Sequence, residues 1–427
     1  MNKSKVLFVL FLMTVLSLES SAMKIISLNR GWYFNKGYES QRTDKVIVDL
    51  PHTWNVADAM FGNVDYYRGM ATYSRSIIIP ETEPCKRVFL KVNAAQTVAD
   101  IYLDNHFISQ HKGGYTAFTV ELTDWIRKGQ SHKLDIRVNN AQTMEIAPIC
   151  GDFNIWGGLN RGVELLLAED VCIDPSYYGS SGVFFTQKNV SEKSADLCVK
   201  TLISGSEMNL KDCSLEFVLL DAESKEVLRK EMPVTAGNLS FDTKISQPHL
   251  WEGVHCPYLY KGIVILKRGN KEMDRREESI GFRYYTVDPD QGFSLNGKPY
   301  LLQGANYHED RAERASAFRS SDFDEDLDLM QEMGCTAVRL SHYPQAKYLH
   351  TQLDKRGLIA WVEIPFVNVY VSHPYYKENL KQQLIELILQ NYNHPCILAW
   401  GLFNEINPGW LENPNQMAEE LNKLAKE

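Results

Sequence analysis

The chain has 427 residues, of which 44% are hydrophobic and 23% are charged, and its formal net charge is −9. A chain of this length folds into two or three domains, and this composition is typical of globular proteins with sizeable cores. The acidic balance and the absence of a basic stretch argue against an electrostatic surface for nucleic acid, so no nucleic-acid partner is expected.

The first 22 residues have the pattern of a secretory signal peptide. Lys3 and Lys5 precede an apolar run over residues 6–18 that is too short to cross a bilayer comfortably, and the small residues "SSA" follow at 20–22. No Cys comes directly after the run, so a lipoprotein anchor is not indicated. We therefore expect a secreted or periplasmic protein with no membrane span.

Residues 23–175 and 176–286 are predicted to form two β-sandwiches. Short strands rich in β-branched and aromatic residues recur there, and Pro, Gly and Asn separate them. "DNHF" at 104–107 and "HKGGY" at 111–115 predict hairpin turns. The turn-rich stretch 172–182 marks the boundary, and the strand spacing after it is typical of an immunoglobulin-like sandwich.

From residue 287 to residue 427 strands and helices alternate. The four predicted strands are near-continuously apolar and lie at 300–306, 335–342, 358–366 and 396–405. A helical pattern follows each of them, and Ser321 and Asp324 have the spacing of a capping box at the start of the first helix. This alternation predicts a parallel sheet covered by helices.

The eight Cys residues are scattered and include no C-x-x-C pair. This distribution argues against a zinc ribbon and against a disulfide-dense framework. Most of them are expected to be buried single thiols.

Several segments, in order along the chain, resemble glycoside hydrolase family 2, the β-galactosidase and β-glucuronidase group. They are "VDLPHTWN", "WGGLNRGVEL", "VRLSHYPQ" and "HPCILAWGLFNE". The resemblance implies a sugar-binding β-sandwich jelly roll over 23–175 and an immunoglobulin-like β-sandwich over 176–286. It implies the first half of a (β/α)8 TIM barrel over 287–427, which ends after the fourth βα unit.

The resemblance identifies Glu405 as the catalytic acid/base, although "FNE" alone would also suit a strand-end residue that caps the next helix. It assigns Asn404 a hydrogen bond to the 2-hydroxyl of the sugar. It places Arg339 and His342 at the end of the second strand, where a guanidinium keeps a carboxylate nucleophile ionised and His342 binds a sugar hydroxyl. His308 resembles a second histidine that contacts the sugar.

Asp152 resembles the acidic residue that the jelly roll sends into the sugar site, although "GDFN" also suits a turn. Glu363 ends the third strand, and adjacent strands would bring it near Glu405. The family offers no precedent for Glu363 as the second catalytic carboxylate, so we interpret it as supporting structure. After Glu363 the chain reads "IPFVNVY", without the acidic and His residues that hold a metal in some members. No metal site and no cofactor are therefore expected.

Retaining glycosidases use two carboxyl groups roughly 5–5.5 Å apart. In this family the nucleophile lies on the seventh barrel strand, so we expect it to be absent from the chain. We therefore expect a fragment with negligible activity on its own.

The predicted function is hydrolysis of terminal β-linked sugars of oligo- or polysaccharides, with β-galactosidase favoured. β-Glucuronidase, β-mannosidase and a catalytically inert carbohydrate-binding protein are the alternatives, and the oligomeric state is left open.

Overall fold

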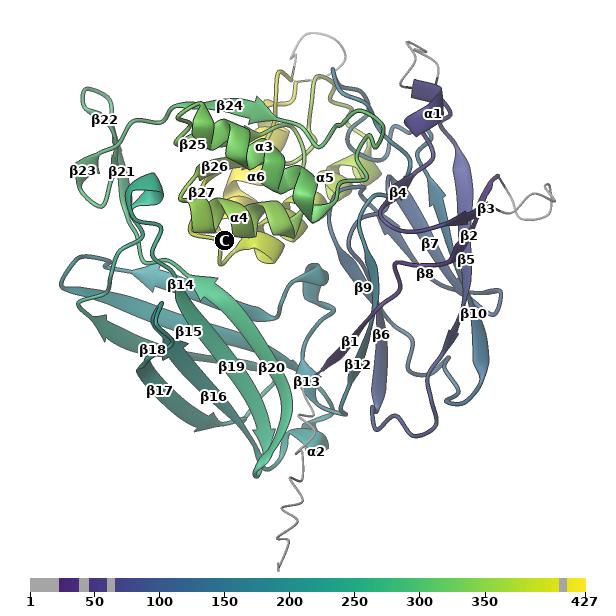
Figure 1. The fold of residues 1–427 in the computed structure, drawn as a ribbon, viewed down its shortest axis with the longest axis horizontal. Helices are drawn as coiled ribbons and strands as arrows, with labels where there is room; N and C mark the ends of the chain where they lie inside the picture. The colour runs from purple at the N-terminus through teal and green to yellow at the C-terminus, as the bar shows by residue number, and fades with distance from the viewer. Residues whose placement is uncertain (1–22, 38–45, 60–65, 407–412) are drawn as a thin grey trace, which may run out of the picture.

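The computed structural model describes residues 23–37, 46–59, 66–406 and 413–427. The predicted signal peptide, residues 1–22, lies outside these ranges and stays a prediction. Figure 1 shows two sheet-rich parts and a third part in which helices cover a small sheet. Among the described helices none is both long and apolar enough to span a membrane.

The N-terminal part is an antiparallel sandwich built around its own core. One sheet has the order β1 (Lys24–Ser27), β12 (Val163–Ala168), β6 (Arg87–Val92) and β9 (Phe118–Glu121). The other has the order β3 (Val46–Val48), β2 (Trp32–Lys36), β5 (Met70–Ile78), β10 (Ser131–Asn139), β7 (Val98–Leu103) and β8 (His106–Lys112). The short strands β4 (His52–Thr53) and β11 (Gly158–Leu159) pair with each other, and α1 spans Val56–Ala59.

One of the two hairpins predicted in this sandwich forms, and the other does not. Asp104 and Asn105 both have positive φ and join the paired strands β7 and β8, as the two-residue turn requires. The prediction for 111–115 is wrong, because β8 pairs with β7 whereas β9 pairs with β6 in the other sheet. This segment therefore crosses from one sheet to the other.

The second part is also an antiparallel sandwich. One sheet contains β13 (Cys172–Ile173), β15 (Ser194–Ser204), β14 (Val183–Lys188) and β18 (Asn238–Ser246). The other has the order β17 (Glu226–Pro233), β16 (Cys213–Leu220), β19 (Tyr260–Arg268) and β20 (Lys271–Ile280). The short elements α2 (Glu207–Leu210), η2 (Tyr177–Gly179) and η3 (Gly253–His255) lie in the connections between these strands. Because β13 begins at Cys172 and pairs with β15, it belongs to the second sandwich. The boundary between the two sandwiches therefore lies before Cys172, slightly ahead of the boundary expected at 175/176.

The third part confirms the predicted alternation of strands and helices. After a small antiparallel sheet of β21 (Tyr285–Asp288), β22 (Gly292–Leu295) and β23 (Lys298–Pro299), four parallel strands lie side by side in chain order. They are β24 (Gly304–Tyr307), β25 (Ala337–Leu340), β26 (Ile359–Glu363) and β27 (Ile397–Gly401). The helices are α3 (Ser320–Glu332), α4 (Lys347–Arg356), α5 (Pro374–Asn391) and α6 (Asn415–Lys426).

The ends of the first two of these helices follow from local chemistry. The carboxylate of Asp322 accepts a hydrogen bond from the backbone N–H of Arg319 at 2.7 Å and so caps α3. The predicted capping pair, Ser321 and Asp324, is therefore two residues too late. Gly357 ends α4 with φ 76°, a conformation that glycine adopts without steric cost.

A stripe of polar side chains on α5 packs against the N-terminal sandwich instead of facing solvent. Its members are Asn379, Gln383, Glu386 and Gln390, spaced to lie on one face of the helix. Glu386 accepts hydrogen bonds from Thr116 and from the buried ring of His111, at 2.5 and 2.9 Å. These contacts satisfy polar groups that would be costly to bury unpaired.

The second sandwich is also joined to the helical part by hydrogen bonds. The indole N–H of Trp251, which is fully buried, donates to the carbonyl of Asp354 at 2.9 Å. Arg283 donates to the carbonyl of Pro395 at 2.6 Å, and Asn393 donates to the carbonyl of Val183 at 2.9 Å. All eight Cys residues are free thiols.

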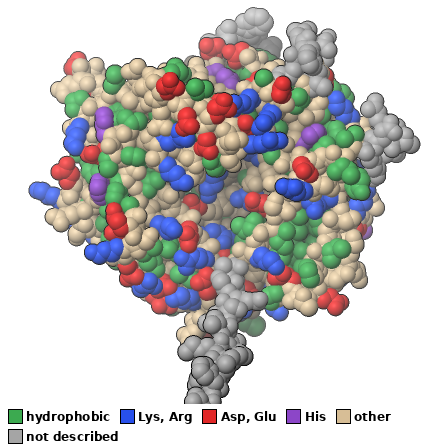
Figure 2. Space-filling view, viewed as in Figure 1, with side chains coloured by type: hydrophobic (Ala, Val, Ile, Leu, Met, Phe, Trp, Pro, Cys, Tyr) green, Lys and Arg blue, Asp and Glu red, His purple; other side chains and the backbone are tan. Residues whose placement is uncertain are grey.

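A cavity of about 570 Å³ lies where the three parts meet. Lys91, Glu164, Arg276, Glu278 and Lys347 are among the residues that line it. Figure 2 shows acidic and basic side chains around a hollow at the centre of the face it views.

Two buried histidines should make the folded state sensitive to acid. Burial, and secondarily the charge of His394, lowers the pKa of His350 to about 3. Burial, and secondarily the charge of Lys36, lowers the pKa of His52 to about 4. Each folded-state pKa lies below the value of 6.5 for an unperturbed histidine.

We predict that the free energy of unfolding falls as the pH decreases from about 6.5 toward 4, because the unfolded chain then takes up protons that the folded chain does not. Each histidine contributes roughly 2 kcal/mol to the loss at pH 5. Urea unfolding at pH 7.5 and 5 tests this. His350→Asn should show a smaller loss than the parent chain, and the exposed control His106→Gln should not. An unchanged loss in His350→Asn would contradict the prediction.

Candidate active site

The carboxyl ends of the four parallel strands bring together side chains that are far apart in the sequence. Parallel strands end at the same edge of a sheet, and this edge is where α/β barrels place their chemistry. A groove of about 410 Å³ runs along the inner face of the sheet, and Arg339 and Trp361 are among its lining residues.

Glu363, the last residue of β26, lies at the centre of the cluster and is 1% exposed. Its Oε1 accepts a hydrogen bond from Nε of Arg339 at 2.6 Å, and its Oε2 lies 2.8 Å from Nδ1 of His342. The carboxylate accepts a hydrogen bond from Nδ1–H in this contact, so Nε2 of His342 is the nitrogen left to face a ligand. Among the described residues Nε2 has no hydrogen-bond partner.

Asn404 is held by the same guanidinium. Nη2 of Arg339 donates to Oδ1 of Asn404 at 2.8 Å, which leaves the Nδ2 amide group as the donor available to a ligand. The backbone of Asn404 is fixed on both sides, because its N–H donates to the carbonyl of Phe366 and its carbonyl accepts from the N–H of Asn368. The strand-end segment after β27 is thereby bonded to the segment after β26.

Glu405 follows Asn404 with φ 49°, in the left-handed region that non-glycine residues seldom adopt. Its side chain is exposed, and it makes no hydrogen bond to any residue that the structure describes. Such a carboxyl group is accessible to a ligand at the strand ends, and its role as acid/base remains a prediction.

His308, directly after β24, is held by two hydroxyl groups. Its Nδ1 lies 3.3 Å from the hydroxyl of Tyr343, and its Nε2 lies 3.3 Å from the hydroxyl of Ser341. Burial, and secondarily the charge of His342, lowers the pKa of His308, so the ring is neutral at neutral pH. A contact from His308 to a sugar would require one of these hydroxyl groups to turn away.

Asp152 belongs to the N-terminal sandwich, yet it lies close enough to this cluster to act on it electrostatically. Its side chain is exposed, and its negative charge opposes the lowering of the His308 pKa. The next residue, Phe153, places its ring centroid 5.8 Å from that of His308 and 6.2 Å from that of His342. The loop that carries Asp152 therefore reaches the strand ends of the third part.

Three other parts of this site were not predicted from the sequence. Phe153 packs against the site histidines, Tyr343 holds His308, and the buried carboxylate of Glu309 accepts from the N–H of Ala346 at 2.6 Å. Tyr343 lies within the quoted "SHYP" segment, and Phe153 lies within "GDFN", so both motifs contained the signal. Within the described ranges no three His, Cys, Asp or Glu residues are grouped so as to hold a metal ion.

Three family models match consecutive parts of the chain. "Glycosyl hydrolase 2 galactose-binding domain-like" matches residues 44–148, and "Glycosyl hydrolases family 2" matches residues 181–283. "Glycosyl hydrolases family 2, TIM barrel domain" matches residues 288–426, the part that contains the site.

Curated proteins with these similarities are named as glycosidases. A β-glucuronidase of Bacteroides fragilis is 39% identical over 98% of this chain and 61% of its own length. A β-galactosidase of Thermoanaerobacterium thermosulfurigenes is 30% identical over 93% of this chain and 57% of its own length. The chain thus spans less than two thirds of either relative.

Two solved structures show the same fold over 95% of the chain. A putative β-galactosidase from Bacteroides fragilis is 32% identical, with a TM-score of 0.88 and 62% of that chain covered. Bacteroides uniformis β-glucuronidase 2, covalently bound to cyclophellitol-6-carboxylate aziridine, is 30% identical, with a TM-score of 0.85 and 51% of that chain covered.

The buried carboxylate of Glu363 should be the main stabilising group at the strand ends. Glu363→Gln leaves the guanidinium of Arg339 without its charged partner, and Arg339 is only 34% exposed. We expect the free energy of unfolding to fall by about 1–3 kcal/mol, less than for a fully buried pair because solvent screens the guanidinium. Denaturant unfolding measures the change.

A matched control is Glu378→Gln on α5, where the carboxylate is 72% exposed and, among the residues that the structure describes, pairs only with a lysine of the same helix. This change should cost less than about 0.5 kcal/mol. Equal effects of the two substitutions would show that Glu363 does not have the stabilising role assigned to it.

Proposed function

The chain belongs to glycoside hydrolase family 2, and on that premise we propose that its strand ends form the acid/base half of a site that hydrolyses terminal β-glucuronides. The observation that carries the proposal is the arrangement at these ends, where Asn404 and Glu405 follow β27 beside the buried Glu363 group. The described residues supply an accessible carboxyl group together with polar donors on fixed side chains.

Each group has a separate task in the proposed reaction. The carboxyl of Glu405 protonates the leaving oxygen, and its carboxylate then removes a proton from the incoming water. The free Nδ2 of Asn404 donates to the 2-hydroxyl of the sugar, a contact that strengthens in the transition state. The proposed task of Arg339, whose Nη1 has no partner among the described residues, is to keep a carboxylate nucleophile ionised.

Glu363 is not proposed as the nucleophile. Both of its oxygens are engaged, one by Arg339 and the other by His342. An attack on the anomeric carbon would require it to give up one of these contacts while remaining buried. Its proposed task is to orient Arg339 and His342, in line with its interpretation as supporting structure.

The relatives favour a β-glucuronide over the β-galactoside that the sequence analysis favoured. The Bacteroides fragilis relative at 39% identity is named a β-glucuronidase. The Bacteroides uniformis enzyme is covalently bound to a cyclophellitol aziridine that bears a 6-carboxylate, the group that distinguishes a glucuronide from a galactoside. A β-galactoside remains the second candidate, because a relative at 30% identity is named a β-galactosidase.

The test of substrate class uses the full-length product of the gene that encodes this chain. We expect its kcat/KM for an aryl β-glucuronide to exceed that for the corresponding β-galactoside by at least about tenfold, since a site built for a charged group discriminates against its absence. A higher value for the galactoside would favour the second candidate. No turnover of glucuronide, galactoside or mannoside would refute a glycosidase and leave the carbohydrate-binding alternative.

The role of Glu405 predicts a dependence on the leaving group. In Glu405→Gln, kcat/KM for an alkyl β-glucuronide should fall by about 10²–10⁴-fold, because the leaving alkoxide needs a proton. For a dinitrophenyl β-glucuronide the loss should be below about tenfold, because that leaving group departs without protonation. Steady-state kinetics on the two substrates measure the difference.

The control for this prediction is Glu419→Gln on the exposed face of α6, which should leave both values unchanged. If Glu405→Gln lowers kcat/KM equally for both leaving groups, the residue is not the proton donor.

A further inference from the structure

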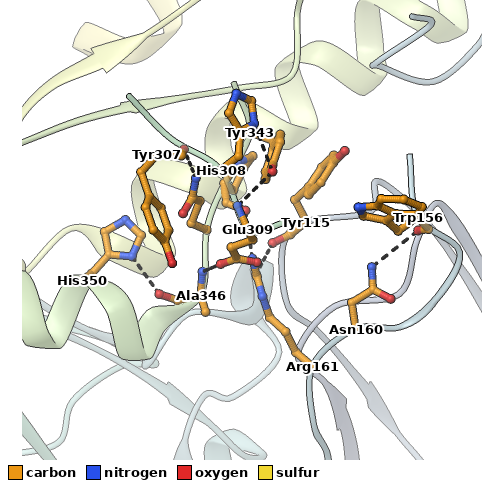
Figure 3. Close-up of polar contacts among 12 residues, drawn as sticks. Tyr115, Trp156, Asn160, Arg161, Tyr307, His308, Glu309, Tyr343, Ala346 and His350 are labelled. Atoms are coloured by element: carbon orange, nitrogen blue, oxygen red, sulfur yellow. Dashed lines mark hydrogen bonds and ion pairs between the residues drawn. The ribbon is translucent and has the colours of Figure 1, made fainter. Parts of the chain in front are cut away.

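We propose that Arg161 of the N-terminal sandwich is a positioning residue for the strand-end site. The inference rests on the proposed function and adds a residue to it. Figure 3 shows Arg161 reaching from the N-terminal sandwich to Glu309, which directly follows the site residue His308. The hydrogen bonds of Arg161 go to Tyr115, Glu309 and Pro344 and to none of the residues assigned to sugar binding or catalysis, so its effect on the reaction would act through other residues.

The guanidinium of Arg161 bonds to three separate segments. Its Nη2 lies 3.0 and 3.1 Å from the two carboxylate oxygens of Glu309 and donates to the carbonyl of Pro344 at 3.0 Å. Its Nη1 donates to the carbonyl of Tyr115 at 2.5 Å. One side chain thus connects the N-terminal sandwich, the end of β24 and the loop between β25 and α4.

Glu309 transmits this restraint into the loop that carries His342. The carboxylate is 4% exposed, and its Oε1 also accepts from the N–H of Ala346 at 2.6 Å. Pro344 and Ala346 both follow His342 closely in the chain, so the guanidinium and the carboxylate hold the same short loop at two points.

The backbone of Glu309 links the same pair to His308. Its N–H donates to the hydroxyl of Tyr343 at 3.1 Å, and this hydroxyl lies 3.3 Å from Nδ1 of His308. The ring of Tyr343 stacks on that of Tyr115 with centroids 4.4 Å apart and an angle of 16° between the planes. Both site histidines therefore depend on contacts that cross from the third part to the N-terminal sandwich.

Lysine cannot replace all of these contacts, because a single ammonium group does not span a carboxylate and two carbonyls as the planar guanidinium does. Displacement of catalytic groups by about 1 Å costs on the order of 10²-fold in rate. Arg161→Gln should therefore lower kcat for the preferred glycoside of the full-length protein by about 10- to 100-fold. Arg161→Lys should recover part of the loss, because it keeps the charge beside Glu309.

The matched control is Glu386→Gln. Like Arg161→Gln, it removes a charged group that joins the N-terminal sandwich to the third part, but Glu386 lies on α5, twelve residues after the start of the helix at Pro374. Glu386 makes none of the hydrogen bonds that hold the 341–346 loop; its partners are His111 and Thr116 of the N-terminal sandwich and Gln382 of α5. It should lower the thermal midpoint without a comparable loss of kcat.

A second measurement does not require activity. Hydrogen exchange of the backbone amides from 341 to 346 should be at least about tenfold faster in Arg161→Gln than in Glu386→Gln, because the loop loses its anchor at the Pro344 carbonyl and the carboxylate that holds Ala346 loses its charged partner. Equal exchange in the two variants overturns the proposal, whatever the protein hydrolyses. If the parent protein hydrolyses none of the glycosides but Arg161→Gln still exchanges faster than Glu386→Gln, the positioning role is supported and the proposed function is refuted separately.

Discussion

The organisation of the strand ends depends on the burial of one carboxylate. Glu363 is 1% exposed, and a buried carboxylate is tolerated only when its oxygens are paired. Arg339 and His342 meet that requirement, each from the neighbouring strand β25 or the loop after it. Once Arg339 is fixed in this way, its Nη2 group donates to Oδ1 of Asn404 and so determines the orientation of the Asn404 amide.

The N-terminal sandwich contributes to this site as well as to stability. Phe153 contacts both site histidines, and Arg161 holds the segments that carry them. The polar side chains on one face of α5 make further contacts at the same interface, through charged or amide groups such as Glu386. Polar interfaces of this kind fix orientation more strictly than apolar ones, because each hydrogen bond has a required distance and angle.

Much of the fold could be predicted from the sequence, because strand and helix periodicities and turn residues are local signals. Asp104 and Asn105 gave the correct hairpin, and the four βα units followed from apolar strands between helical patterns. The failures were non-local: the segment 111–115 looks like a turn but crosses between sheets. In the site, the common location of Arg339, His342 and Asn404 could be predicted because each lies at or just after the end of a predicted strand. The contact between Arg161 and Glu309 could not, because 148 residues separate them and no local pattern connects them.

The pairing pattern also determines what the site offers to a ligand. Glu363 and Asn404 use their acceptor oxygens on Arg339 and His342, so the groups without a hydrogen-bond partner among the described residues are Nδ2 of Asn404, Nη1 of Arg339 and Nε2 of His342. Two of these are donors. An array of fixed donors suits the oxygens of a sugar and a carboxylate nearby, and it costs no reorganisation when charge develops during the reaction. The same buried carboxylate that stabilises the strand ends therefore also prepares the polar surface on which the proposed chemistry depends.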